Sequence, residues 1–359
     1  MKLNVRLLLL ILMLPLGCPP ATQPQSCDVT PALEPDLLPR RPFAESSIWN
    51  RPVPADGAFA DVTEAIFGDP RYAPTRVIPD LVTVAYTDPA QPLVRIEKNR
   101  GWRLPQRATS SGVLLYERHL SLTAGIGVSW NKVGNALFNI VDPATWLADE
   151  GVGGWRCPGQ PLLTLLSDAP RSHNIDVLNG DGLRGYGRGS GLPALGGLLR
   201  LGELKNGVNH ALAVMFPAHT YSSSRHFVWP ASAADQYAGN LLYGYGGANP
   251  NFTMGTLLAI PRDIDVHAVP WKTPQGAILA VCAQQYGWYV VDSSTAEPGV
   301  TVMCLAVEVR AALQDIGYAI EPDTGHESVN PAILDAVGFT DDVISILRMT
   351  KAVVSNVPS

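Results

Sequence analysis

The sequence predicts a mainly β protein, with a β-sandwich or jelly-roll-like body, a few short helices and a small helical appendix at the C-terminus. Two observations predict this class. Most apolar runs between Asp61 and Val309 are four to eight residues long and end at Gly, Pro, Asn or Asp, which is typical of strands. Helical patterns are few, and many short strands with few helices favour a sandwich or a related β architecture.

The first seventeen residues, 1–17, have the pattern of a cleaved export signal. A basic start precedes an apolar run at 7–14, which is too short to cross a bilayer. Gly17 and Cys18 further indicate a bacterial lipoprotein in which the thiol of Cys18 is acylated, although Pro15 stands where such signals usually carry Leu. The alternative is a plain secretory signal with an ordinary cysteine. In both cases we expect an extracytoplasmic protein, either on the cell envelope or secreted.

Residues 18–41 are rich in Pro and have little periodicity. This composition predicts a tether that holds the folded body off a surface. The body is expected to span 42–328, and Trp49 is expected to fasten its first segment to the core, because N-terminal segments are mobile unless an apolar group holds them. The remaining residues, 329–359, form the predicted helical appendix.

Eight apolar runs of the body fit strands. They are 81–87, 112–122, 136–142, 197–204, 210–216, 256–261, 288–294 and 300–309. Pro274 can open a helix that has one apolar face and ends at Gly287. Two further helices are predicted in the appendix, one from Asn330 to Gly338 and one capped by Thr340.

Charge and composition exclude several classes of function. Without residues 1–17, which hold two of the 26 basic residues and no acidic one, the formal charge changes from −6 to −8. The basic surface that nucleic acid requires is therefore absent. No later apolar stretch has the length of a membrane span, so a lipid anchor is the expected contact with the membrane.

Apart from Cys18, the cysteines are even in number. Cys27, Cys157, Cys282 and Cys304 allow two disulfides in three possible pairings. Cys282 could instead be a buried apolar residue. The spacings lack the CxxC pattern of zinc sites, and we expect neither a metal nor a cofactor.

Two motif matches in the glycine-rich region are weak. Gly180, Gly182 and Gly185 match the dinucleotide fingerprint, but no helical pattern follows them. Ser190 lacks the flanking glycines of a nucleophile elbow. The sequence therefore disfavours both a nucleotide cofactor and a serine hydrolase triad.

Glu203 and His210 are the strongest catalytic candidates. In the predicted strand 197–204, Glu203 shares a face with two leucines, and partial burial would favour its protonated form and general acid work. An Asn-Gly turn at 206–207 would form a hairpin that brings His210 beside Glu203, and such a pair can move protons near neutral pH. The alternatives are an exposed Glu at a strand end and a His that bonds its own turn.

Other side chains suit a sugar ligand. Indole rings and charged groups recognise sugar rings and uronates, and the candidates for substrate binding are Trp229, Trp49, Arg200 and Asp235. A second carboxylate beside Glu203 could come from Asp181, Asp235 or Asp292, although each also stands where a turn-capping Asp is expected.

The blocks GLPALGGLLRLGEL, HAL, VWPA, MG and QQYGWYVVD, with the WN-P opening, resemble an uncharacterised group of exported bacterial β-rich proteins. The matching positions are Trp49, Asn50, Gly191 to Pro193, Arg200, Glu203, His210 to Leu212, Trp229 to Ala231, Met254, Gly255, Tyr286, Gly287 and Asp292. The resemblance covers about 43–292, implies an exported β-rich body and singles out Glu203 and His210. Relatives usually carry Arg where this chain has Asn209, which weakens any role for a cation there.

Two hypotheses follow from these observations. The first is a surface-anchored enzyme that cleaves an extracellular polysaccharide, either as a glycoside hydrolase or as a polysaccharide lyase. Hydrolysis would use Glu203 as the acid and Asp181 or Asp235 as its partner, whereas a lyase would use His210 or a Tyr as the base. The second is a non-catalytic envelope lipoprotein that binds glycan or cell-surface components.

Overall fold

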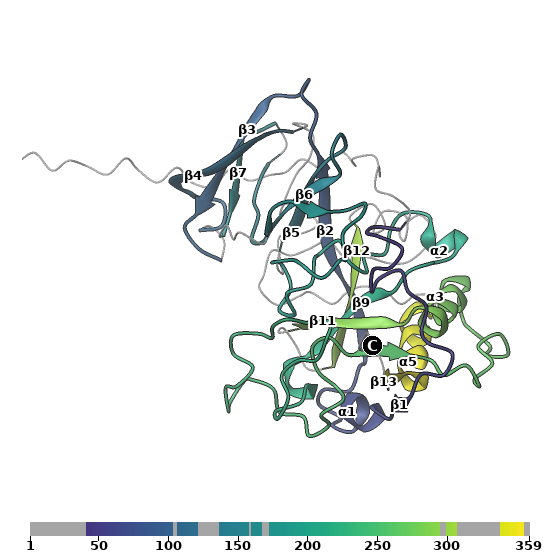
Figure 1. The fold of residues 1–359 in the computed structure, drawn as a ribbon. Helices are drawn as coiled ribbons and strands as arrows, with labels where there is room; N and C mark the ends of the chain where they lie inside the picture. Colours follow the sequence, from purple (N-terminus) through teal and green to yellow (C-terminus); the bar gives the residue numbers. More distant parts are fainter. Residues whose placement is uncertain are drawn as a thin grey trace, which may run out of the picture.

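β-Strands dominate the chain, and the helices between them are few and short (Figure 1). The computed structural model describes residues 41–102, 106–120, 136–157, 159–166, 172–294, 299–306 and 338–354. Over these residues the predicted mainly β class is confirmed. The predicted signal, the tether up to residue 40 and the predicted helix from Asn330 lie outside them.

The larger sheet has ten strands in the described part of the chain. In spatial order they are β1 (Phe59–Ala60), β13 (Lys351–Val353), β10 (Leu257–Ala259), β11 (Trp288–Ser294), β9 (Leu212–Pro217), β12 (Val300–Ala306), β2 (Arg76–Tyr86), β5 (Leu137–Asp142), β6 (Leu147–Gly151) and β8 (Ile175–Asp176). The pairs β11–β9, β12–β2 and β2–β5 are parallel, and the other neighbours are antiparallel. The sheet is therefore mixed, and segments far apart in sequence meet in it.

A smaller sheet packs against one end of the larger one (Figure 1). Its strands, in order, are β4 (Ser110–His119), β3 (Leu93–Asn99) and β7 (Leu162–Leu165). Ala85, Phe138 and Ile140 of the larger sheet share a buried cluster with Val94, Ile96, Leu163 and Leu165 of the smaller one. Burial of these side chains gives the body a two-layered, sandwich-like end.

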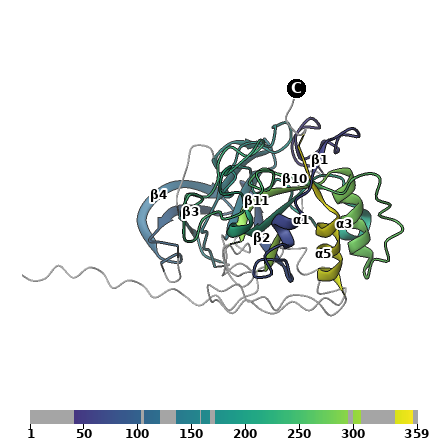
Figure 2. The same cartoon turned by 90° about the horizontal axis from the view of Figure 1, so that it is seen from below.

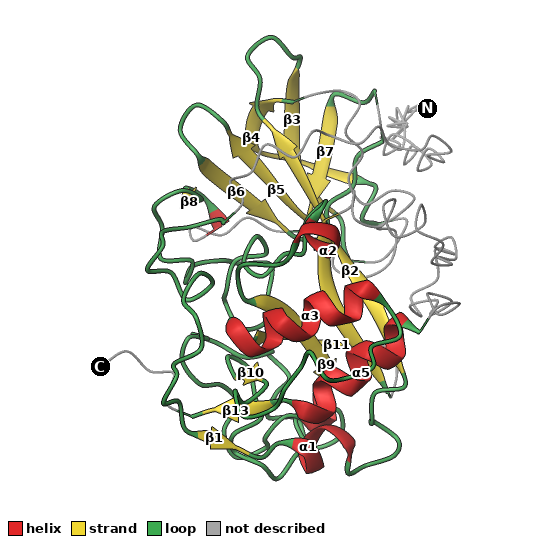
Figure 3. Cartoon of the chain, turned by 90° about the vertical axis from the view of Figure 1, so that its right-hand side faces the viewer, coloured by secondary structure: helices red, strands yellow, loops and turns green. Residues whose placement is uncertain are grey.

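Helices α3 (Pro274–Gln285) and α5 (Phe339–Met349) lie against the larger sheet near β9 and β11 (Figure 3). The predicted start of α3 is confirmed, because Pro274 opens the helix and the side chain of Thr273 accepts the N–H of Gly276 at 2.9 Å. Gly287 follows the helix with a φ of 76°, which favours glycine. The short helix α1 (Thr63–Phe67) lies at the opposite end of the body from the smaller sheet (Figure 1).

The C-terminal segment is built into the larger sheet. α5 packs against α3, and its residues Val343, Ile346 and Leu347 belong to the main core. β13 then inserts between β1 and β10, and the view from below shows the yellow C-terminal segment running from α5 toward β1 (Figure 2). The helix begins at Phe339 after Gly338, whose φ is 84°, so Thr340 lies inside it and does not cap it.

The prediction of a strand at 197–204 is wrong. Gly202 adopts a φ of 85°, which turns the chain, and Glu203 begins the four-residue helix α2 (Glu203–Asn206). The predicted hairpin around the Asn-Gly turn is therefore absent from this described segment, and β9 starts only at Leu212. The alternation of Leu and polar residues had indicated a strand, but Leu198 and Leu199 are buried in succession.

The described residues include one cysteine in a disulfide and one free cysteine. Cys157 is in a disulfide, whereas Cys282 of α3 is a buried free thiol, so the possibility of two disulfides among four cysteines is wrong. Burial raises the pKa of the Cys282 thiol. Cys18 and Cys27 lie outside the described residues. None of the described helices has the length and apolarity that a bilayer span requires.

Candidate functional site

Hydrogen bonds hold the glycine-rich segment 185–194 against the larger sheet. The buried carboxylate of Glu150 in β6 accepts three backbone N–H groups, those of Tyr186, Gly187 and Ala194, at 2.7, 2.5 and 2.6 Å. Ser190 donates its N–H to the carbonyl of Val291 in β11 at 3.0 Å. The segment is therefore fastened to two strands, and the side chain of Arg188 lies between these attachments.

Arg188 is the buried cation of the site. Its side chain is 0% exposed, and Nη1 donates to the carboxylate of Asp80 in β2. Its charge also favours the ionised forms of Asp292 and Glu150, although burial has the larger effect and raises the pKa of both. One guanidinium therefore balances several carboxyl groups in the interior.

Asp235 and Asp292 meet beneath Gly189. A Cβ atom on Gly189 would lie 2.7 Å from Oδ1 of Asp235 and 2.9 Å from Oδ1 of Asp292, so only glycine leaves room for both carboxyl groups. The two carboxyl groups are close enough for each to change the pKa of the other. Asp292 lies in β11 just after an irregularity in its register with β9, and such bulges re-aim side chains.

Burial sets the proton affinity of this pair. Burial, together with the charge of Asp235, raises the pKa of Asp292 to about 8, and burial also raises the pKa of Asp235. Asp292 is 6% exposed, whereas Asp235 is only partly buried. Because two adjacent carboxylates repel each other, the pair retains a proton at neutral pH, with Asp235 on the accessible side.

Tyrosine hydroxyls surround the carboxyl pair. The hydroxyl of Tyr245 donates to Oδ2 of Asp235 at 2.9 Å, and that of Tyr237 is hydrogen-bonded to Ser293. Burial and the charge of Asp235 raise the pKa of both tyrosines, so their hydroxyls stay protonated. Tyr237 is partly exposed, which makes it a proton donor that a ligand can approach. The arrangement can therefore accept a proton at Asp235 and donate one at Tyr237.

The structure brings Glu203 and His210 together, as predicted, but as a closed pair. Nε2 of His210 lies 2.8 Å from Oε1 of Glu203, and Nδ1 lies 2.9 Å from the carbonyl of Ala211. Because both ring nitrogens already face oxygen atoms of the protein, neither is open to a substrate. His210 is 2% exposed. This geometry is that of a structural ion pair that ties α2 to the start of β9.

The other predicted site residues are buried or are bonded within the protein. Trp49 is 1% exposed and donates its indole N–H to the carbonyl of Gly182 at 2.9 Å, so it fastens the first segment, as predicted, but offers no face to a sugar. Arg200 is 6% exposed. Asp181 caps its own turn by accepting the N–H of Leu183 at 2.9 Å, which was the alternative considered for it.

Trp229 is partly buried against the main core. The guanidinium of Arg51 lies 5.7 Å from the centroid of its ring, so one face already has a cationic partner. Of the predicted site residues, Asp235 alone lies in the carboxyl pair, together with Asp292, which had been considered as a second carboxylate. Sequence reasoning missed Arg188 and the tyrosines at 237 and 245, although all three stand in the GYGRGSG segment or near YGYGG.

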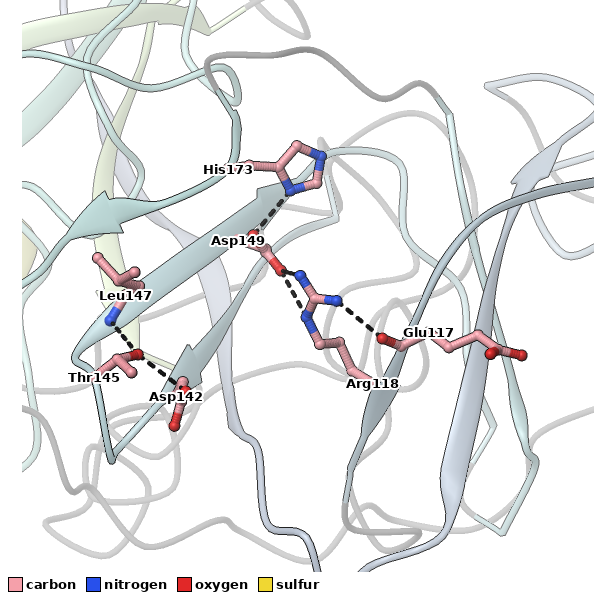
Figure 4. Close-up of polar contacts among 7 residues, drawn as sticks. All are labelled: Glu117, Arg118, Asp142, Thr145, Leu147, Asp149 and His173. Carbon is pink, nitrogen blue, oxygen red and sulfur yellow. Dashed lines mark hydrogen bonds and ion pairs between the residues drawn. The ribbon is translucent and has the colours of Figure 1, made fainter.

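A separate cleft of about 910 Å³ opens between β4 and the β5–β6 hairpin. Figure 4 shows Arg118 of β4 reaching across to Asp149 of β6, with Nε at 2.9 Å from Oδ2, while Nδ1 of His173 lies 2.8 Å from Oδ1. Asp142 accepts the N–H of Ala144 at 2.9 Å, and this bond lowers its pKa. These charged groups therefore already have partners within the protein.

In the part of the chain that the structure describes, no group of three His, Cys, Asp or Glu side chains is arranged to hold a metal ion. The resemblance to exported bacterial proteins stays a prediction. Comparison of the chain with family models, with curated proteins and with solved structures finds no match in any of the three.

Proposed function

We propose that the protein is an exported enzyme that cleaves an extracellular polysaccharide, with Asp235 and Asp292 as its proton-transfer unit. The observation that carries this proposal is the close approach of a buried carboxyl group, that of Asp292, and a partly exposed one, that of Asp235, beneath Gly189, where burial raises the pKa of both. Such pairs cluster at catalytic sites, because a pKa near neutral pH suits a group that must both take up and release a proton. The predicted export signal supports a substrate outside the cell.

The spacing of the carboxyl groups limits the mechanism. Both Oδ1 atoms lie within 3 Å of one point, the Cβ position of Gly189. The inverting glycosidases need a separation of about 6.5–9.5 Å to admit a water molecule, so the two groups lie too close together for an inverting pair. They act as one unit on one side of the substrate, where Asp235 accepts the proton and the hydroxyl of Tyr237 donates one to the departing oxygen.

A lyase reaction fits this one-sided arrangement. Asp235 would remove the proton next to the carboxylate of a uronate, the bond to the glycosidic oxygen would break, and the proton of Tyr237 would go to that oxygen. The products are an unsaturated uronide and a new hydroxyl end. Hydrolysis is the other route, in which Asp235 would take a proton from water, the water oxygen would bond to the anomeric carbon as its bond to the glycosidic oxygen breaks, and Tyr237 would protonate that oxygen.

The test is turnover on a panel of neutral and uronate polysaccharides. Asp235→Asn and Tyr237→Phe should each lower the rate by at least about a hundredfold, which is the usual contribution of a general acid or base. Asp263→Asn is the control, because this carboxylate is exposed and is not part of the site. It should leave the rate unchanged. Products that absorb in the ultraviolet identify a lyase, and new reducing ends without this absorbance identify a hydrolase. Full turnover by Asp235→Asn would contradict the proposal.

The cleft beside β4 favours a second candidate, a non-catalytic envelope protein that retains glycan. Its volume of about 910 Å³ is in the range of ligand sites. Arg118→Ala would remove the bridge to Asp149 across the cleft. If no polysaccharide of the panel is cleaved, yet one is retained and Arg118→Ala abolishes its retention, this second function replaces the first.

A further inference from the structure

A turn between Tyr237 and Tyr245 presents the most exposed large apolar side chains of the described residues. Their exposed fractions are 99% for Leu241, 84% for Leu242 and 60% for Tyr243. Single apolar residues on a surface are common, but three consecutive ones at the tip of a turn form a patch that water solvates poorly. Such a patch is typical of a contact surface.

Backbone hydrogen bonds hold this patch outward. Oδ1 of Asn240 accepts the N–H of Leu242 at 2.9 Å and that of Tyr243 at 3.3 Å. Behind the tip, Tyr245 donates its N–H to the carbonyl of Ala238 at 2.9 Å. These bonds fix the shape of the turn, in which the ring of Tyr243 lies 6.2 Å from that of Tyr237 and Leu241 and Leu242 stand at the tip. Presenting them in this way lowers the entropic cost of a contact.

Basic side chains flank the turn. His226 packs edge-on to Tyr245, with ring centroids 5.7 Å apart, and its Cε1 atom lies 3.7 Å from the Cβ position of Gly239. The neighbouring Arg225 is exposed and forms no ion pair with any described residue. An apolar tip beside basic groups matches the boundary of a bilayer, where acyl chains meet phosphate groups.

The length of chain that precedes the body brings such a surface within reach. If Cys18 is acylated, the segment 18–40 can span at most about 80 Å, since an extended chain covers about 3.3–3.6 Å per residue. A body of this length has a radius of gyration of about 20 Å. Because this tether is longer than the body is wide, an acylated Cys18 would leave the body free to turn residues 240–243 toward the bilayer.

We propose that the turn 240–243 inserts into the interface of a phospholipid bilayer, with Leu241 and Leu242 among the acyl chains and Arg225 against the phosphate groups. This contact goes beyond the proposed cleavage reaction and does not depend on it. It would orient the body, because Tyr245, directly behind the tip, is hydrogen-bonded to Asp235 of the carboxyl pair. The site would then lie close to the membrane surface.

The test uses the chain from residue 18 onward with Cys18→Ser, so that no acyl chain contributes to binding. We expect this protein to sediment with vesicles of phosphatidylcholine and phosphatidylglycerol. Leu241→Ser with Leu242→Ser should lower the partition coefficient at least about tenfold, because two exposed leucines lose their burial. Val113→Ser with Leu201→Ser is the matched control, since these residues are 52% and 51% exposed elsewhere, and it should leave partitioning unchanged.

A second measurement reports insertion directly. Tyr243→Trp places an indole at the tip, and its fluorescence, taken as a difference from the parent protein, should shift to the blue and be quenched by brominated lipids. Equal sedimentation of the parent and the double Leu variant, or an indole that brominated lipids fail to quench, overturns the proposal. The proposal is also overturned if the parent protein fails to sediment with the vesicles and instead self-associates through the turn.

Discussion

Replacing Asp292 by Asn should remove a specific part of the pH dependence of stability. The folded protein holds a proton on Asp292 up to a pKa of about 8, whereas an Asp in an unfolded chain loses it near pH 3.9. Between these values the native state binds more protons than the unfolded state, so the free energy of unfolding falls as the pH rises. Asn stays neutral over this pH range and has nearly the same size as Asp.

The magnitude follows from this pKa difference. The contribution of Asp292 is complete below pH 4, and it declines by roughly 1.4 kcal/mol per pH unit until the pH passes 8. Between pH 5 and pH 8 the loss amounts to roughly 3–4 kcal/mol. Since Asp292 is 6% exposed, solvent screens little of this effect.

Urea denaturation of the parent protein and of Asp292→Asn at pH 5, 6, 7 and 8 measures the effect. The difference in free energy of unfolding between the two proteins reports the titration of the Asp235–Asp292 pair, because the titrating groups outside the pair are common to both. Parent stability should fall relative to the variant across this range, whereas Asp263→Asn should follow the parent. A parent–variant difference that stays constant from pH 5 to pH 8 would refute the assignment of the proton to Asp292.

Three further predictions concern the same region and its neighbours. Gly189→Ala places a methyl group 2.7 Å from a carboxyl oxygen. It should lower the free energy of unfolding by about 1–3 kcal/mol and abolish turnover. Gly239→Ala, whose methyl group would have its nearest contact at 3.7 Å, should do neither. Glu203→Gln should lower stability by about 2–4 kcal/mol in urea, because buried His210 loses its counter-ion, yet leave cleavage of the panel unchanged; a collapse of turnover at unchanged fold would contradict the structural role. Cys282 should react with a thiol reagent only in denaturant, because burial raises its pKa, and mass spectrometry would locate the label; rapid labelling of the native protein would contradict this.

The sequence predicted most of the strands and the helix at Pro274, because each depends on local signals. Runs such as 210–216 and 288–294 have few positions at which a strand could start or end. Thr273 and Pro274 begin one helix, and Gly287 follows its end. The order of the strands could not be predicted in the same way. β2 lies between β12 and β5, and such pairings depend on contacts between distant segments.

The helix at Glu203 shows where local reasoning fails. The alternating pattern of 197–204 matched a strand, but Gly202 turns the chain with a φ of 85°, and nothing in the pattern distinguishes a glycine in a strand from one in a turn. The contact between Glu203 and His210 was nevertheless predicted, because a separation of seven residues brings the two together both in a hairpin and in a short helix followed by a turn. Their chemistry was not, since the carbonyl of Ala211 that occupies the second ring nitrogen is a backbone group that the sequence does not reveal.

At the carboxyl pair, the proposed proton transfer and the stability of the fold make opposite demands. Two adjacent acids in the interior, with one guanidinium near them, cost more to bury than apolar side chains of the same volume would. The fold tolerates them because Arg188 lies close to Asp292 and hydrogen bonds fix the segment above them. That segment must pass so close that position 189 has no room for a side chain. Leucine or valine in place of the two acids would stabilise this point of the sheet more, and the proposed proton transfer gives a physical reason for acids there.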